Sequence, residues 1–340
     1  MTVERIKEMV AGSEYDFLRT NPHLKDRIIF LTLGGSYSYG TNVETSDVDV
    51  RGCALNTPSD LLGLTNFEQV VHTQTDTTVY SFNKLIKLLL NCNPNTIEML
   101  GCKPEHYFLL TDTGRMMIEN RKLFMSKRAV HSFGGYATQQ LRRLENALAR
   151  DKMPQSRREE HIRNSMERAV QSFKSRYTEF DKGSFILYTD DSPREDLDRE
   201  IFADITLKKF PAREFNSMIN DLTNVLSDYE KLNHRNKKKD DNHLNKHAMH
   251  LIRLYLMCLD ILEKGDIVTY RGNDLDLLMS IRHGEYQKED GTYRQEFFDM
   301  VNEFEARLAY AKENTALPEN PDMKRVEEFV MEVNRRSLDG

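Results

Sequence analysis

The spacing of apolar residues at the start of the chain is close to the helical period. Val3, Ile6 and Val10 belong to a set that predicts an amphipathic helix over residues 3–17, and Asn21-Pro22 then interrupts this pattern. The following apolar run, residues 28–33, is rich in β-formers and ends at two glycines. It therefore predicts a buried strand that leads into a turn.

Alternating positions predict a second strand soon afterwards. Val48, Val50 and Cys53 fall on one face and polar residues on the other. A third strand is expected within residues 70–80. Ser81 is suited to cap a helix that follows it, because an apolar stripe repeats over residues 82–90.

The pattern after Asn93-Pro94 is mainly helical. Helical periodicity predicts segments at residues 107–124, 128–150, 157–178, 212–233, 243–264, 273–283, 293–313 and 322–336. Two apolar stretches, residues 185–188 and 201–207, predict a small hairpin inside this region. The chain is therefore expected to be α+β, with strands and helices in residues 1–115 and a mainly α-helical region in residues 116–340.

Composition narrows the class of protein. The 340 residues exceed what one hydrophobic core usually serves, which agrees with two domains. No stretch approaches eighteen consecutive apolar residues, and charged residues crowd the N-terminus, so neither a membrane span nor a secretory signal is predicted. The four cysteines lack a paired spacing and are expected to be reduced. These features predict a cytoplasmic protein.

The net charge of -6 argues against a protein that coats nucleic acid by bulk charge. Its distribution is uneven, because residues 115–182 contain sixteen Lys or Arg and eight Asp or Glu. This region is a candidate anion-facing surface. The basic residues of this candidate surface include Arg142, Arg143, Arg157, Arg158, Arg163, Arg168, Lys174 and Arg176. The aromatic residues suited to stack on bases are Tyr136, Phe173 and Tyr177.

The candidate chemistry lies around the first two strands. Gly34 and Gly35 permit close approach of a phosphate to the backbone, and Ser36 can donate a hydrogen bond to it. On the next strand, Asp47 and Asp49 are two positions apart and point to the same face. Two carboxylates so placed repel each other unless a cation lies between them, and Mg²⁺ with phosphate oxygens is the natural occupant.

Neither element is specific alone, because a Gly-Gly turn or an isolated Asp-x-Asp is usually structural. Their order and separation make the combination informative. The chain has no Gly-Lys-Ser/Thr sequence and no Gly-x-Gly-x-x-Gly after a strand, so a P-loop and a dinucleotide-binding fold are excluded.

The combined motif, Gly34-Gly35-Ser36 followed by Asp47-x-Asp49, resembles the signature of the DNA-polymerase-β-type nucleotidyltransferase superfamily. The longer string through Gly52 resembles the RNA-repair-associated (RlaP-like) branch. Further likeness lies in patches that extend the resemblance to residue 285. These are Asn93-Pro94-Asn95 with Glu98, Gly135-Tyr136 with Gln140, Lys246-His247-x-x-His250-x-x-Arg253-Leu254, and Ile281-Arg282-x-Gly284-Glu285.

The resemblance implies a polymerase-β-like mixed sheet, two Mg²⁺ ions, and attack of a hydroxyl on the α-phosphate of an NTP with loss of pyrophosphate. It also implies a third carboxylate on a neighbouring strand. Asp76 is the candidate because it falls in the next expected strand, with Glu68 and Glu98 as alternatives. Asp76 also fits a purely structural role as a turn residue.

Basic residues complete the candidate site. Arg51 continues the face of the aspartates, where it can either neutralise one of them or contact the triphosphate. Lys246, His250 and Arg253 share one helical face and suggest contact with a nucleotide, although a solvated face is the alternative. His243-x-x-x-His247 is not a zinc-protease motif, because Leu244 stands where a Glu is required.

The predicted function is Mg²⁺-dependent transfer of NMP from an NTP to a hydroxyl, most plausibly at an RNA or tRNA end. Transfer to a protein hydroxyl and a non-catalytic nucleotide-binding protein are the alternatives. The nucleotide-binding residues are expected to be Gly34, Gly35, Ser36, Arg51, Lys246, His250 and Arg253, and the metal ligands and catalytic residues Asp47, Asp49 and Asp76.

Overall fold

The fold was obtained from a computed structural model. It describes residues 1–152, 179–180, 183–191, 199–207, 215, 218–219, 222–223, 241–288 and 291–339. The chain divides into two compact units, one formed by residues 1–144 and 241–340 and the other by residues 145–240.

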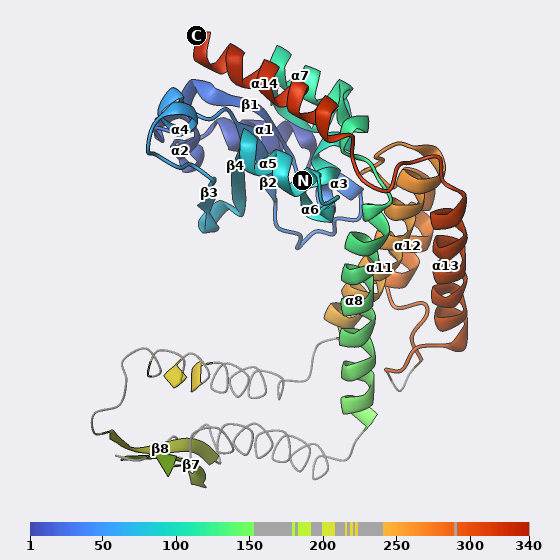
Figure 1. Ribbon diagram of the computed structural model, residues 1–340. Helices are drawn as coiled ribbons and strands as arrows, with labels where there is room; N and C mark the ends of the chain where they lie inside the picture. The colour runs from blue at the N-terminus through green and yellow to red at the C-terminus, as the bar shows by residue number, and fades with distance from the viewer. Residues whose placement is uncertain are drawn as a thin grey trace. The chain divides into compact units, whose positions relative to one another are not determined.

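A five-stranded mixed sheet forms the centre of the first unit (Figure 1). Its strands are β1 (Ile28–Leu33), β2 (Val50–Ala54), β3 (Gln69–His72), β4 (Thr77–Ser81) and β5 (Tyr107–Leu110). They lie in the order β3-β4-β2-β1-β5. The pairing of β2 with β4 is parallel and the other three pairings are antiparallel, so β2 and β4 begin at the same edge of the sheet.

Every residue of β1 is buried, as its apolar run predicts. The strand expected within residues 70–80 is instead a pair, β3 and β4, because the chain turns at Thr73–Asp76. The helix expected over 107–124 is wrong at its start. Residues 107–110 pair with β1 as strand β5, and Thr111 then caps the helix that follows.

Helices flank the sheet. In the first part of the chain they are α1 (Val3–Ala11), α2 (Phe17–Thr20), α3 (Gly35–Tyr39), α4 (Pro58–Leu62), α5 (Phe82–Leu89), α6 (Pro94–Ile97), α7 (Asp112–Glu119) and α8 (Arg128–Lys152). The single helix expected over 3–17 is broken because Gly12 ends α1 in an extended conformation. Ser81 caps α5 as predicted, with its side chain accepting from the Lys84 N–H.

Short 3₁₀ turns and one π-helical turn connect these elements. The 3₁₀ turns are Ser13–Tyr15, Lys25–Arg27, Thr73–Thr75, Glu98–Gly101, Pro104–His106, Arg121–Phe124 and Gly272–Asp274, and a π-helical turn spans Asp260–Lys264.

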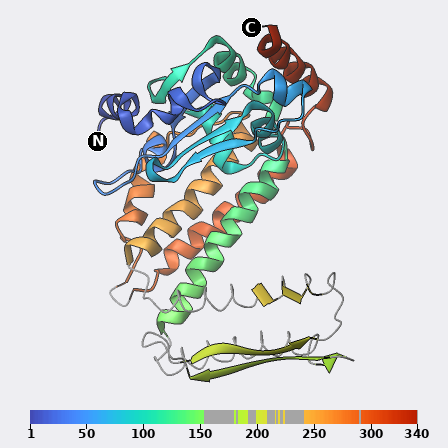
Figure 2. The ribbon, with the colours of Figure 1, turned by 90° about the vertical axis from the view of Figure 1, so that its left-hand side faces the viewer.

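The C-terminal residues of the first unit are helical, as predicted. They form α11 (Asp241–Leu259), α12 (Leu275–Arg282), α13 (Gln295–Asn314) and α14 (Met323–Asp339). Helices α11, α12 and α13 pack together beside the first part of α8, while α14 returns to the sheet (Figures 1 and 2). Phe329 of α14 packs against Phe82 and Phe124, which explains why this distant segment belongs to the same unit.

The domain boundary expected between residues 115 and 116 stays a prediction. The compact units follow a different division, because α11–α14 pack with the sheet-containing part of the chain rather than with residues 145–240. As a result, Arg253 of α11 lies close to Glu98 and Tyr39, which belong to the sheet-containing part of the chain.

Described strands of the second unit are β6 (Glu179–Phe180), β7 (Gly183–Asp191) and β8 (Arg199–Leu207). The antiparallel pairing of β7 with β8 confirms the predicted hairpin. The helix expected over 157–178 and most of that over 212–233 lie outside the described residues. So do the side chains of Arg142, Arg143, Arg157, Arg158, Arg163, Arg168, Lys174, Arg176, Phe173 and Tyr177. No helix among the described residues is both long and apolar enough to cross a membrane.

Candidate active site

The Gly-Gly turn packs directly against the second strand's aspartate. Gly35 has a φ of +54°, and a Cβ placed there would lie 1.9 Å from Asp49 Oδ2. At Gly34 a Cβ would lie 2.9 Å from Arg51 Cγ, and the Gly34 N–H donates to the Asp49 carbonyl at 2.9 Å. Only glycine fits this contact, because any side chain at residue 35 would displace the carboxylate. Ser36 follows, half-buried, as the second residue of α3.

Two carboxylates meet where β2 and β4 begin. The parallel register pairs Val50 with Thr77, so the residues just before them, Asp49 and Asp76, are neighbours across the sheet. The Val50 N–H donates to the Asp76 carbonyl at 3.2 Å. Asp76 therefore lies in the turn before β4 rather than within a strand, with a φ of +40°, yet its side chain reaches that of Asp49.

Burial is the main cause that raises the pKa of Asp49 to about 7, and a hydrogen bond with Asp76 raises it further. The nearby negative charges of Asp76 and Glu98 act in the same direction, whereas Arg51 lowers the pKa. A carboxyl group under these conditions is stabilised in its ionised form by an added cation.

Arg51 is the counter-ion of this pair. Its Nη2 donates to Asp49 Oδ1 at 2.8 Å and to Asp76 Oδ1 at 3.1 Å. Of the two roles considered for Arg51, the structure shows neutralisation of the aspartates.

The remaining acidic candidates are placed differently. Asp47 is exposed on the extended segment before β2, and the structure brings it into no three-residue cluster. Glu68 lies at the opposite end of β4 from Asp76 and pairs with Lys84 at 3.0 Å, so it is away from the two aspartates. Among the described residues no group of three or more His, Cys, Asp or Glu side chains is gathered closely enough to hold a metal ion.

The donor set nevertheless fits a divalent cation. Asp49 and Asp76 present carboxylate oxygens side by side, and the Gly34–Gly35 turn packs so closely against Asp49 that only glycine fits at residue 35. Oxygen ligands from one or two carboxylates, completed by water and substrate phosphates, are what Mg²⁺ requires in phosphoryl-transfer sites.

Glu98 is buried behind the aspartates and is held by two partners. Tyr39 Oη donates to Glu98 Oε2 at 2.6 Å, and Arg253 Nη1 donates to the same oxygen at 3.4 Å. The Arg253 guanidinium also lies 3.7 Å from the centre of the Tyr39 ring. Burial raises the pKa of Glu98, while the Arg253 charge opposes this shift. This network joins α11 to the last residue of α3, the helix that begins at Gly35.

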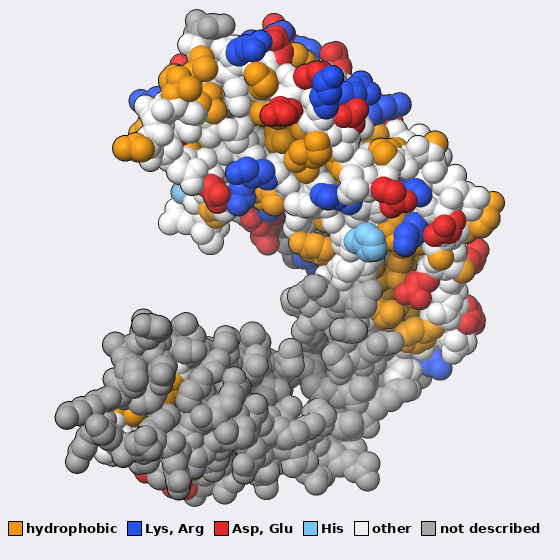
Figure 3. Space-filling model, in the orientation of Figure 1, with side chains coloured by type: hydrophobic (Ala, Val, Ile, Leu, Met, Phe, Trp, Pro, Cys, Tyr) orange, Lys and Arg blue, Asp and Glu red, His pale blue; other side chains and the backbone are white. Residues whose placement is uncertain are grey.

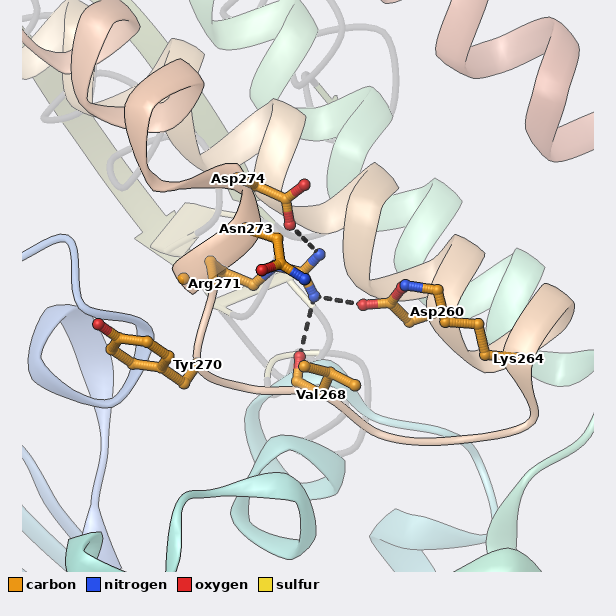
Figure 4. Close-up of a pocket in the computed structure, with 8 residues that line it drawn as sticks. Asp260, Lys264, Val268, Tyr270, Arg271, Asn273 and Asp274 are labelled. Carbon is orange, nitrogen blue, oxygen red and sulfur yellow. Dashed lines mark hydrogen bonds and ion pairs between the residues drawn. The ribbon is translucent and has the colours of Figure 1, made fainter.

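A loop between α11 and α12 supports the same helix. The Arg271 N–H donates to the Tyr39 carbonyl at 3.0 Å, and Thr269 Oγ1 donates to the Glu98 carbonyl at 2.5 Å. The buried Arg271 side chain pairs with Asp260 at 2.5 Å and also with Asp274 (Figure 4). These residues line a pocket of about 230 Å³, whose charged groups are largely paired with one another.

Lys246, His250 and Arg253 occur on α11 as expected. Lys246 is exposed, His250 is half-buried, and Arg253 is buried. His247, one position aside from that face, instead contacts Gln140 Oε1 of α8 at 2.8 Å. The structure therefore brings Arg253 close to the aspartates through Tyr39 and Glu98, with His250 and Lys246 further along the helix.

Sequence reasoning had Glu98 and Arg253 as separate candidates and missed Tyr39 as their common partner. Glu98 and Arg253 are 155 residues apart, so no local pattern signals their contact. Tyr39 belongs to the motif that begins at Gly34, but the motif does not predict the direction of the Tyr39 ring.

The fold is that of a polymerase-β-like nucleotidyltransferase, with its mixed sheet, flanking helices and helical C-terminal region. Residues 6–165 match the model of the family described as RlaP, RNA repair pathway DNA polymerase beta family. Over this segment the chain is similar to that family, which confirms the resemblance drawn from the motifs. Neither the search of curated proteins nor that of solved structures found a match.

The description of the matching family indicates nucleotidyltransferase activity associated with RNA repair. The match includes the Gly34–Ser36 turn and all three candidate aspartates, and it ends before α11. The basic residues of α11 are therefore linked to the site by the structure rather than by the family model.

Proposed function

We propose that this protein is a Mg²⁺-dependent nucleotidyltransferase that transfers NMP from an NTP to the hydroxyl of an RNA end, such as that of a tRNA, and releases pyrophosphate. The observation that carries the proposal is the meeting of Asp49 and Asp76 beside the Gly34–Gly35 turn. A non-catalytic nucleotide-binding protein would have no need to hold two carboxylates in this partly buried position, where they repel each other.

Each part of the site has a role in this reaction. Gly34, Gly35 and Ser36 bind and orient the triphosphate, because the first N–H groups of α3 have no acceptor within the helix and can donate to phosphate oxygens. Asp47, Asp49 and Asp76 would hold Mg²⁺, which when bound lowers the pKa of the attacking hydroxyl and neutralises charge on the leaving oxygens.

Basic side chains act on the substrate's phosphates. Arg51 neutralises Asp49 and Asp76 in the absence of substrate and is close enough to the turn to contact a triphosphate there. Lys246, His250 and Arg253 approach the nucleotide from α11. The acceptor oxygen then forms a bond to the α-phosphorus while the bond from that phosphorus to the β-phosphate bridging oxygen breaks, and pyrophosphate leaves.

RNA is the proposed acceptor for two reasons. The family is described by its place in an RNA repair pathway, and residues 115–182 carry a surplus of basic residues. On the face shown in Figure 3, basic and acidic side chains are interspersed over the described residues, which agrees with local rather than general attraction to nucleic acid.

A labelling experiment tests the proposal. The purified protein is incubated with Mg²⁺, each of the four α-labelled NTPs and a cell extract, after which RNA and protein are separated. Label in RNA is the expected result. Label found only in protein would replace RNA with a protein hydroxyl as the acceptor, and no label in either fraction would contradict the enzymatic function.

The aspartate variants supply the mechanistic control. Asp47→Ala and Asp49→Ala should each abolish transfer, by about 1,000-fold or more, because each removes a proposed metal ligand. Asp112→Ala, at an aspartate whose side chain is 99% exposed on α7, should leave transfer unchanged. All three variants should remain folded, since none removes a core contact, and full activity in the Asp49 variant would refute the assignment.

A further inference from the structure

Cationic groups surround His250 where α11 packs against α12. Lys246 and Arg253 lie one turn away on either side of His250 along α11, and Arg282 is the last residue of α12. Burial, together with the positive charges of Arg253, Lys246, His247 and Arg282, keeps the pKa of His250 well below its usual value. The imidazole is therefore neutral at pH 7 and adds no charge of its own, but it can still donate or accept a hydrogen bond.

Two of these groups have buried donors with no acceptor. Arg253 is 6% exposed, and its Nε has no hydrogen-bond partner although its Nη1 donates to Glu98. Arg282 Nη1 is likewise buried and without a partner, and no ion pair of Arg282 occurs among the described residues. Burial of the Arg282 guanidinium lowers its pKa, which is the effect expected of a charge with no compensating anion.

Unpaired buried donors on charged groups are costly, so their presence on two adjacent helices indicates a ligand that supplies acceptors. The ligand must be an anion. Among Lys246, His250, Arg253 and Arg282, only Arg253 pairs with a carboxylate in the described part of the chain, and that carboxylate is Glu98. A guanidinium presents its donors in a planar fork that matches phosphate oxygens.

We propose that Arg282 joins Lys246, His250 and Arg253 to form the site for the triphosphate of the NTP, with Arg282 closing it from α12. This inference rests on the proposed function and extends it, because sequence reasoning assigned no role to Arg282. The residues of this site come from α11 and α12, two helices of the C-terminal part of the first unit.

The position of the site favours a triphosphate over an RNA backbone. At its Arg253 end it touches Tyr39, the last residue of the helix that starts at the Gly34–Gly35 turn. Lys246 is seven residues away, which at 1.5 Å per residue is about 10 Å along the helix axis. Three positive charges and a neutral imidazole over that length suit a compact polyanion that begins at the turn.

Binding measurements by titration calorimetry in Mg²⁺ test this assignment with two probes, inorganic tripolyphosphate and a single-stranded RNA oligonucleotide with a free 3′-hydroxyl. Arg282→Gln should weaken tripolyphosphate binding by about 10- to 100-fold, the effect of losing hydrogen bonds to a charged group, and leave RNA binding within about two-fold. Arg282→Lys should lose less because it keeps the charge.

Arg307→Gln is the matched control. Arg307 lies on α13, which also packs against α11, but it pairs with Glu263 and is distant in the sequence from the site residues. Its replacement should leave the affinity for both probes unchanged. Lys246→Gln provides a second test that does not depend on a buried residue, since Lys246 is exposed and its loss should not impair folding.

Each outcome decides between alternatives. If Arg282→Gln weakens RNA binding and leaves tripolyphosphate binding intact, the site belongs to the RNA backbone and the assignment is overturned. Unchanged binding of both probes also overturns it. If Arg282→Gln does not fold, Lys246→Gln decides the question. An unchanged tripolyphosphate affinity of Lys246→Gln would then overturn the assignment. A parallel titration of the wild type with each of the four NTPs in Mg²⁺ separates this inference from the proposed function. If no NTP binds, the proposed function is refuted as well. If an NTP binds the wild type and the variants keep their tripolyphosphate affinity, only the triphosphate site is refuted.

Discussion

Two arginines of the candidate site pair with carboxylates, but their ion pairs differ in exposure to solvent. At the sheet edge, the Arg51 side chain is 21% exposed and bridges Asp49 and Asp76, whose side chains are 20% and 56% exposed. At the junction with α11, Arg253 and Glu98 have side chains only 7% and 8% exposed. The first pair is accessible to a metal ion that would compete for its carboxylates, whereas the second is part of the packed interior.

This difference in exposure predicts different roles for the two sites. A partly hydrated ion pair contributes little to stability, so its guanidinium can exchange partners at low cost. Removing one member of a buried pair leaves an uncompensated charge in a low-dielectric environment, which is strongly destabilising. The sheet edge is therefore suited to metal binding. At the junction, the bond of Arg253 Nη1 to Glu98 holds α3 and α11 together, and only the unpartnered Nε of Arg253 is left for the proposed triphosphate.

The largest effect is expected at the junction. Arg253→Met should lower the free energy of unfolding by about 3–5 kcal/mol, because Glu98 then remains buried without its partner. Adding Glu98→Gln should recover part of this loss. Denaturant unfolding measures both, with Arg307→Met as a control at an exposed pair, where a loss below about 1 kcal/mol is expected. A loss at residue 253 no greater than that at residue 307 would show that the junction is not a structural element.

The glycine turn should show the next largest effect. Gly35→Ala forces a side chain into a left-handed backbone conformation and into the Asp49 carboxylate, so we expect a loss of about 2–4 kcal/mol together with weaker Mg²⁺ binding. Gly265→Ala is the matched control. Gly265 has a similar φ of +61° but nothing within 4 Å of an added Cβ, so only the backbone cost of about 1–2 kcal/mol applies. Equal losses for the two variants would contradict the close contact of the turn with Asp49.

A smaller effect concerns pH. Because the folded protein keeps the pKa of His250 below its unfolded value of 6.5, the unfolded state binds the extra proton first as the pH falls. Stability from this group is therefore complete above about pH 6.5 and decreases below it, by at most about 1.4 kcal/mol per pH unit. Thermal unfolding at pH 7.5 and 5.5 should show a smaller decrease for His250→Gln than for the wild type. Replacement of the exposed His131 by Gln should not reproduce that difference.

The smallest effect on stability is expected at Arg51. Arg51→Gln should change the free energy of unfolding by less than about 1 kcal/mol, since its ion pairs are partly hydrated. The comparison with Arg253→Met under the same conditions is decisive. If the two variants lose equal stability, the sheet edge is as much a part of the packed interior as the junction, and the division between chemistry and structure fails.

Much of the local structure could be predicted because it depends on neighbours in the sequence. The apolar run of residues 28–33 forms β1, Ser81 caps α5, and α11 extends over the predicted helical stripe. Errors arose where tertiary pairing overrode the local pattern. Residues 107–110 were assigned to a helix from their apolar content, but they form a strand because the free edge of β1 supplies hydrogen-bond partners.

The candidate site illustrates the same limit. The Gly34–Gly35 turn and the Asp47-x-Asp49 spacing are recognisable in the sequence, and the family that they resemble is the one whose model matches residues 6–165. Asp76 was selected from its expected strand, yet it lies in a turn. It reaches Asp49 because β4 pairs with β2 in a parallel register, which is a property of the sheet.

The sequence by itself determined the strands, helices and glycine turn, because propensity, capping and hydrophobic periodicity act between residues a few positions apart. Only the tertiary structure decided that Glu98 meets Arg253 across 155 residues and that Arg282 lies beside His250. Such contacts depend on how helices and strands pack to bury their apolar faces, and the same local pattern is compatible with many packings until the whole chain has folded.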